Sequence, residues 1–325
     1  MAPHAALMWH GGQTEAAAQL YPAAPGPWLD LSTGISPWAW PVPAIEPQQW
    51  QALPSRTALE HLELAAATAF GMNNPEQIAA VPGSDIAIRL LARLLPAERV
   101  AVIGQSYAGY RAAWPEARVL PFDKARGAEL MICANPNNPD GWIIEARKLQ
   151  RLRNIRIVDE AFADAMPEVS MLPQRNGAIV LRSFGKFFGL AGIRLGFVVA
   201  NKPLIRELRN LLGDWPISGP AIAIGTAAYC DRTWQSTQRL RLTKGSAQLT
   251  ALLRSQGLQD AGGTANFRLC HAPDAPGLFT HLCRAGILVR PFIDRPGQLR
   301  LGIPGTETDW ARLETALLAW SKRND

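Results

Sequence analysis

The sequence has few cysteines, and their spacing does not suggest a metal site. It holds four cysteines in 325 residues, and no two of them form a Cys-x-x-Cys pair. Cysteines scattered in this way fit neither a zinc cage nor a disulfide framework. We therefore expect reduced thiols, a cytoplasmic protein and no bound metal. The four residues are Cys133, Cys230, Cys270 and Cys283.

Long apolar runs are also missing. Ile193–Ala200 is among the longest candidates, and its length suits a buried strand rather than a membrane span. The first residues, Met1–His10, lack a basic region followed by an apolar stretch, so they do not resemble a secretory signal. We expect no membrane partner.

A basic stripe with interleaved aromatic residues is likewise absent, although the formal net charge is +6. The excess comes from scattered arginines and from one helical face that we interpret as solvated. A charge of this kind affects solubility and the steering of ligands. We expect no nucleic-acid partner, whereas a phosphorylated substrate would be attracted. The solvated face carries Arg147, Lys148, Arg151, Arg153 and Arg156.

The chain does contain a regular alternation of helix-like and strand-like segments. Helical periodicity is found at Ala58–Phe70 and at Asp85–Leu95. Alternation of this kind predicts an α/β fold in which helices cover both faces of a mostly parallel sheet. The apolar runs of strand length are Gln77–Val81, Arg99–Ile103, Leu130–Ala134, Arg156–Val158, Ala178–Arg182 and Arg194–Ala200.

The last third of the chain is expected to form a smaller α+β domain. A long helical stretch from about Pro220 to Gln256 leads into it, and the opening Tyr21–Pro47 has little periodicity. We predict an N-terminal arm over 1–45 that contributes to the small domain and the active site, a large domain over 46–220 and a small domain over 221–325. The later elements are expected at Phe267–Cys270, Pro276–Ala285, Ile287–Arg290, Gln298–Gly302 and Glu307–Ser321.

Four polar residues follow predicted strands in a fixed order. Asn138 lies in an Asn-Pro turn, and Asp159 ends the next strand. Lys186 follows the strand after that, and Arg194 comes eight residues later. Each has an ordinary alternative, because Asn-Pro forms turns, an aspartate can cap a helix, and a lysine is usually just exposed. Ligands collect at the carboxyl ends of parallel strands, so the four together indicate a binding site.

These residues, in this order, resemble the pyridoxal-phosphate enzymes of aminotransferase fold type I, over about residues 10 to 320. The resemblance implies an aspartate-aminotransferase-like fold, a homodimer and pyridoxal 5'-phosphate as the cofactor. Lys186 would hold the cofactor covalently through its amine. Asp159 would keep the pyridine nitrogen protonated, and Asn138 would bind the 3-oxygen of the ring.

The resemblance also implies how the rest of the cofactor is held. Ser183 and Arg194 would bind the phosphate together with the backbone N–H groups of Ser84 and Asp85, where a helix begins. Tyr107 would stack on the ring and take part in catalysis.

The finer resemblance is to the threonine-phosphate decarboxylases of cobalamin synthesis, with the histidinol-phosphate aminotransferases as close relatives. His10-Gly11-Gly12 is similar to a His-Gly-Gly of the decarboxylases, and Asp30–Pro37 is similar to their substrate-side turn. Phe162 stands where the aminotransferases usually have a tyrosine that reaches the 3-oxygen of the ring. Two positions depart from the pattern: Ser36 replaces a common asparagine, and Leu53 replaces a tyrosine that reaches the neighbouring subunit's cofactor phosphate.

The resemblance assigns a substrate site as well. Arg300 would grip the substrate carboxylate and Arg290 the substrate phosphate, because a planar guanidinium suits both anions. His10, Gly34 and Asn138 would complete this site. The implied reaction is the decarboxylation of O-phospho-L-threonine to (R)-1-amino-2-propanol O-phosphate.

Two other functions stay open at this point. A histidinol-phosphate-type aminotransferase would use the same cofactor site and a related phosphorylated substrate. A regulator descended from this fold would carry an additional DNA-binding domain, and no helix-turn-helix segment precedes residue 40. The residues alone therefore favour an enzyme and leave its substrate undecided between two phosphorylated amino compounds.

Overall fold

The computed structural model describes residue 7 and residues 10–322. The chain forms two compact units, which we call the large unit (39–237) and the small unit (1–38 and 238–325). The predicted domain limits after residues 45 and 220 stay a prediction, whereas the compact units divide after Trp38 and Thr237. None of the helices in the described part of the chain is both long and apolar enough to cross a membrane.

A seven-stranded sheet forms the centre of the large unit, with the strand order β2-β8-β7-β6-β5-β3-β4. Strands β3 to β7 pair in parallel, and β8 runs antiparallel to both of its neighbours. This confirms the predicted mostly parallel sheet. The strands are β2 (Ile78–Val81), β3 (Val100–Ile103), β4 (Arg118–Leu120), β5 (Leu130–Ala134), β6 (Ile155–Asp159), β7 (Ile179–Ser183) and β8 (Gly196–Val199).

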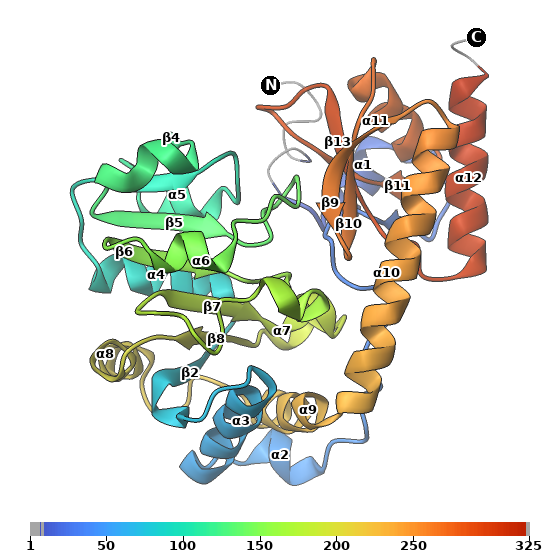
Figure 1. Cartoon of the computed structure of the whole chain (residues 1–325). Coiled ribbons are helices and arrows are strands. Elements are labelled where there is room, and N and C mark those ends of the chain that lie inside the picture. The colour runs from blue at the N-terminus through green and yellow to red at the C-terminus, as the bar shows by residue number, and fades with distance from the viewer. Residues whose placement is uncertain (1–6, 8–9, 323–325) are drawn as a thin grey trace. The chain divides into compact units, whose positions relative to one another are not determined.

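Helices pack against this sheet (Figure 1). One apolar cluster joins the sheet to α4, α5 and α8, and it includes Ile157 of β6 and Tyr110 of α5. Helix α3 packs against α9. The helices are α2 (Pro47–Gln51), α3 (Arg56–Ala69), α4 (Ser84–Leu94), α5 (Gly109–Ala113), α6 (Ala146–Gln150), α7 (Phe184–Phe187), α8 (Lys202–Leu212) and α9 (Gly219–Cys230), and short 3-10 turns are η2 (Pro75–Gln77), η3 (Phe122–Gly127), η4 (Ala163–Ala165), η5 (Pro167–Val169) and η6 (Ala191–Ile193).

The helical stretch predicted from Pro220 to Gln256 is two helices, α9 and α10 (Arg232–Ser255). They are separated at Asp231, whose backbone leaves the helical region at φ −82° and ψ 76°. Its carboxylate accepts hydrogen bonds from the Trp234 N–H at 2.9 Å and the Trp40 indole at 3.2 Å. An aspartate that accepts from an N–H of the following turn starts a new helix, so the break has a local cause.

The small unit contains two sheets. Four strands form an antiparallel sheet in the order β12-β13-β10-β9, and β1 pairs in parallel with β11. The run predicted as one strand at Ile287–Arg290 is therefore divided between the two sheets. The elements are α1 (Thr14–Leu20), β1 (Leu29–Asp30), β9 (Gln259–Thr264), β10 (Phe267–His271), α11 (Ala275–Arg284), β11 (Ile287–Leu288), β12 (Arg290–Pro291), β13 (Gln298–Gly302) and α12 (Glu307–Ser321).

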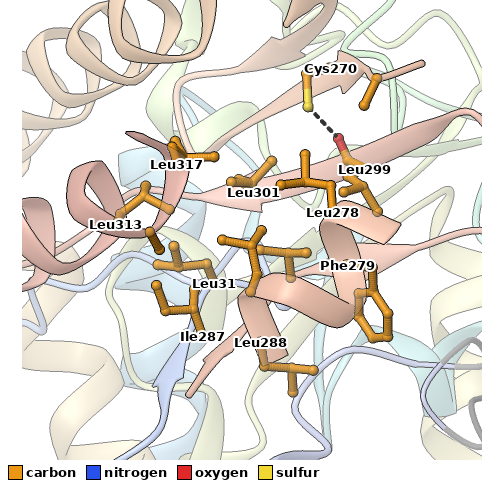
Figure 2. Close-up of a cluster of buried hydrophobic side chains, with 14 of the residues drawn as sticks. Leu31, Cys270, Leu278, Phe279, Ile287, Leu288, Leu299, Leu301, Leu313 and Leu317 are labelled. Carbon is orange, nitrogen blue, oxygen red and sulfur yellow. Dashed lines mark hydrogen bonds between the residues drawn. The ribbon is translucent and has the colours of Figure 1, made fainter. Parts of the chain in front are cut away.

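Figure 2 shows the core of the small unit, where leucines from β13, α11 and α12 meet Leu31 and Ile287. The buried thiol of Cys270 donates to the Leu299 carbonyl at 3.5 Å in this core. Burial raises the pKa of Cys270, which keeps the thiol protonated and apolar in character. The cysteine therefore serves packing here.

Candidate active site

The predicted site residues of the large unit lie where its parallel strands end. Asp159 is the last residue of β6, and Ser183 is the last residue of β7. Asn138 lies in the turn after β5, and Lys186 lies in α7, which follows β7 directly. Because β5, β6 and β7 are adjacent and parallel, these ends share one edge of the sheet.

Asp159 is a buried carboxylate with two fixed hydrogen bonds. The Tyr110 hydroxyl donates to its Oδ2 at 2.8 Å, and the Ala161 N–H donates to its Oδ1 at 3.0 Å. Burial raises the pKa of Asp159, while the two donors and the nearby Lys186 ammonium lower it. A cation beside a buried carboxylate stabilises its charged form, so Asp159 is suited to bind a positively charged group.

Lys186 is half-buried and lies near both Asp159 and Phe162. Its Nζ is 5.9 Å from the centroid of the Phe162 ring. Phe162 itself is only 5% exposed, so it presents an apolar wall to the amine. An amine in such a partly desolvated position is a competent nucleophile toward carbonyls.

An anion cradle lies at the start of α4. Gly83 precedes the helix with φ +87°, and a Cβ placed there would lie 2.6 Å from Arg194 Nη2. A Cβ on Gly196 would lie 2.8 Å from the Ser84 nitrogen. Only glycines allow this close approach, which brings the Arg194 guanidinium to the first N–H groups of a helix. Such a helix end favours phosphate or another anion.

Tyr107 is half-buried beside this helix end. Its hydroxyl donates to Asp85 Oδ1 at 2.9 Å, and burial together with Asp85 raises its pKa. Its ring meets that of Tyr110 edge to face, with 5.6 Å between the centroids. A Cβ on Gly109 would lie 2.2 Å from the Tyr107 ring, so the ring position depends on that glycine.

The turn that carries Asn138 is braced by its neighbours. The Asn135 side chain accepts from the Ile144 N–H at 2.9 Å and donates to the Ile144 carbonyl at 3.1 Å. The Asn137 amide donates to the Gln105 carbonyl at 3.0 Å. These hydrogen bonds fix the turn and so hold Asn138 at the end of β5.

In the small unit, Arg290 and Arg300 face each other across antiparallel strands β12 and β13. Arg300 is only 4% exposed, donates to the Ser32 carbonyl and lies over the Phe267 ring at 4.8 Å. Burial lowers the pKa of Arg300, and Arg290 lowers it further. A guanidinium stays protonated at neutral pH. Two positively charged side chains therefore lie opposite each other on β12 and β13.

Described residues of the N-terminal segment contact Ser32 and Arg290. The Gly12 N–H donates to Ser32 Oγ at 2.7 Å, and Arg290 donates to the Leu7 carbonyl at 3.3 Å. Gly34 has φ +66°, a conformation that favours glycine. His10 is exposed. The small unit thus brings Arg290, Arg300 and the arm together.

Sequence reasoning missed Tyr110. Its signal was its spacing, since it follows Tyr107 by three residues, with Tyr107 just before α5 and Tyr110 in its first turn. Nothing in that spacing identifies Asp159 as its partner, because the two residues are 49 apart in the chain. The packing of α5 against the sheet brings them together.

The chain is similar to known proteins over nearly its whole length. The sequence pattern of the family "Aminotransferase class I and II" matches residues 44–317. The chain is 40% identical to threonine-phosphate decarboxylase of Pseudomonas aeruginosa, covering 97% of this chain and 99% of the relative. It is 39% identical to threonine-phosphate decarboxylase of a Sinorhizobium species, covering 96% and 98%.

Solved structures share the fold at lower identity. Histidinol-phosphate aminotransferase from Sinorhizobium meliloti, in complex with pyridoxal-5'-phosphate, superimposes with a TM-score of 0.81 at 19% identity, covering 96% of this chain and 95% of that one. L-threonine-O-3-phosphate decarboxylase from Porphyromonas gingivalis superimposes with a TM-score of 0.75 at 17% identity, covering 90% and 99%. These likenesses confirm the fold type.

Proposed function

Because the chain belongs to the aminotransferase class I and II family, we propose that it is a pyridoxal-phosphate-dependent decarboxylase of O-phospho-L-threonine. The observation that carries this proposal is the buried carboxylate of Asp159 near Lys186, in the same unit as the anion cradle at Gly83 and Arg194. The two curated relatives at 40% and 39% identity are both threonine-phosphate decarboxylases and match nearly the whole chain.

The residues present fit the cofactor. The cradle is closed to any side chain at Gly83 and Gly196, which leaves it to an anion such as a phosphate. Arg194, Ser183 and the N–H groups of Ser84 and Asp85 would hold the phosphate. Asn138 would donate to the 3-oxygen of the ring, and Tyr107 would lie against the ring face.

When bound, pyridoxal phosphate supplies an electron sink for the bond that breaks at the substrate Cα. Asp159 would keep a proton on the pyridine nitrogen, because a buried carboxylate stabilises an adjacent cation. Lys186 would carry the cofactor on Nζ and, once displaced by the substrate amine, return a proton to Cα after CO₂ has left.

Arg300 and Arg290 would bind the two anions of the substrate. Like charges directly opposite on neighbouring strands destabilise a sheet, so an anionic ligand bound beside the two arginines would be favoured. A substrate with both a carboxylate and a phosphate would provide one negative group for each guanidinium. His10 and Gly34 would contribute from the N-terminal arm and from the turn that follows β1. Fixing both anions would select the bond to the carboxylate for cleavage.

We also propose a homodimer. Large apolar side chains are exposed on the large unit, with Trp50 and Leu53 each 68% and Trp215 57% exposed. Where such side chains form a contiguous patch, they favour a protein partner. Sedimentation of the purified protein would measure the mass, and a monomer at micromolar concentration would contradict the dimer.

The reaction is tested with O-phosphothreonine as the sole substrate. We expect CO₂ release, an amine product that keeps its nitrogen, and no requirement for a 2-oxo acid. Histidinol phosphate with 2-oxoglutarate should give little glutamate. Strong glutamate formation without CO₂ release would instead identify an aminotransferase that uses the same cofactor site.

A further inference from the structure

Tyr110 forms a hydrogen bond that the proposed reaction does not yet use. Its side chain is fully buried, and its hydroxyl donates to Asp159 Oδ2 at 2.8 Å. It is held on α5, which packs against α4 in the apolar cluster of the large unit. A buried tyrosine hydroxyl needs a partner, and here that partner is a carboxylate of the candidate active site.

We propose that Tyr110 is a positioning residue that fixes the orientation of the Asp159 carboxylate. This inference rests on the proposed function, in which Asp159 binds the pyridine nitrogen. Tyr110 itself would touch neither the cofactor nor the substrate. Its effect would pass through one hydrogen bond.

The geometry gives the carboxylate two fixed points. Tyr110 holds Oδ2, and the Ala161 N–H holds Oδ1 at 3.0 Å. Each carboxylate oxygen has two lone-pair sites, so both keep room for a further donor. The plane of the group is set before any ligand arrives, which is the preorganisation that electrostatic catalysis needs.

The neighbouring tyrosine does not duplicate this role. Tyr107 donates to Asp85 Oδ1 at 2.9 Å. The two rings meet edge to face at 84°, and each hydroxyl donates to a different carboxylate. Two tyrosines three residues apart thus serve two acids on different elements.

The hydrogen bond also affects the charge of Asp159. Burial raises the pKa of Asp159, and the bond from Tyr110 opposes that rise. Without the hydroxyl, the pKa would move upward, and the carboxylate would take up a proton at a higher pH than in the natural protein. The titratable groups that face Asp159 are Tyr107, Tyr110, Asp85, Cys133 and Lys186.

The first test uses the protein without cofactor, so that it does not depend on activity. Carbon-13 label in aspartate side chains reports the titration of Asp159, assigned by its loss in Asp159→Asn. In Tyr110→Phe we expect the midpoint to rise by about one to two pH units, the scale of a hydrogen bond to a charged group. An unchanged midpoint would overturn the inference.

Tyr229→Phe is the matched control. Tyr229 is also fully buried, and its hydroxyl has no hydrogen-bond partner among the residues that the structure describes. Both substitutions remove one buried hydroxyl, but only Tyr110→Phe removes a bond to Asp159. A shift of similar size in Tyr229→Phe would assign the effect to packing and contradict the proposal.

The second test uses the cofactor-loaded enzyme. In Tyr110→Phe, the acidic limb of the kcat profile and the visible absorbance should move to higher pH, with little change in KM. Unfolding measured in Tyr110→Phe, Asp159→Asn and the double variant should be non-additive, since the two residues act through one contact. Additive losses would contradict the proposal even if Tyr110→Phe were too unstable for kinetics.

The outcomes separate this inference from the proposed function. If the natural protein releases no CO₂ from O-phosphothreonine, the proposed function fails, whatever Tyr110→Phe does to the titration of Asp159. If it does release CO₂ and the acidic limb of Tyr110→Phe stays in place, only the role of Tyr110 fails.

Discussion

The two units build their candidate sites in different ways. The large unit collects Asn138, Asp159, Ser183 and Lys186 at the ends of adjacent parallel strands, within one continuous part of the chain. The small unit brings Arg290 and Arg300 to a segment from the other end of the chain, since Arg300 donates to the Ser32 carbonyl. The residues of the first site come from one continuous part of the chain. Those of the second site meet only through contacts between segments that are far apart in the sequence.

The contrast extends to charge. In the large unit, the buried Arg182 is paired with Glu160 at 2.9 Å and also with Asp164. In the small unit, Arg290 and Arg300 are cross-strand neighbours of like charge. The first arrangement pairs each charge inside the protein, whereas in the second we propose that a ligand with two negative groups binds the two arginines.

The largest expected effect is the loss of turnover when Lys186 of the large unit is replaced. Lys186→Ala should lower turnover by at least about 10³-fold, because both cofactor attachment and proton return depend on this amine. Cofactor should still bind loosely through the phosphate cradle. Borohydride reduction followed by peptide mass analysis should label Lys186 in the natural protein alone. Labelling of a different lysine would contradict the assignment.

The next effect concerns the buried ion pairs of the large unit. Arg182→Leu should lower the free energy of unfolding by about 3–5 kcal/mol, because it leaves Glu160 and Asp164 without their buried cation. Denaturant unfolding measures the loss.

Arg268→Leu in the small unit is the comparison variant. Its partner Asp260 is 20% exposed and keeps a second partner, Arg254, at 3.1 Å. The expected loss is about 1 kcal/mol or less. Equal losses in the two variants would show that burial does not determine how much each ion pair contributes to the free energy of unfolding.

The large unit was the more predictable of the two. The run Leu130–Ala134 is β5 with the predicted limits, and the other predicted strands of this sheet are present within a few residues. Apolar runs bounded by polar turns are a local signal, so they survive without tertiary information. The order of Asn138, Asp159 and Lys186 is readable for the same reason.

Other elements depended on packing that no local pattern reports. Strand β9 has the sequence Gln-Asp-Ala-Gly-Gly-Thr, with no alternation, and forms at the edge of its sheet by pairing with β10. Ile287–Arg290 contains enough apolar residues for one strand, yet β1 takes its first part and β13 its last residue. Tyr110 could not be matched to Asp159 until the packing of α5 against the sheet was known.

Arg290→Ala tests whether the small unit binds the substrate phosphate. Discrimination between phosphothreonine and threonine should fall by about 1–3 kcal/mol, the scale of a charge-assisted hydrogen bond. The ratio of kcat/KM for the two substrates measures it. Arg300→Ala should instead lower kcat/KM for both substrates, since both carry a carboxylate. Equal losses on both substrates in Arg290→Ala would place Arg290 outside the phosphate pocket.

The smallest expected effect is on stability without substrate. Arg290→Gln should raise the free energy of unfolding by about 0.2–1 kcal/mol, because it removes a like charge opposite Arg300. Arg290→Lys keeps the charge and should show no such gain. Inorganic phosphate should raise the Tm of the natural protein more than that of Arg290→Gln, since binding to the folded state stabilises it. A loss of stability in Arg290→Gln would mean that the contacts of Arg290 with Leu7 and Phe292 outweigh the repulsion, and that the pair of arginines is structural.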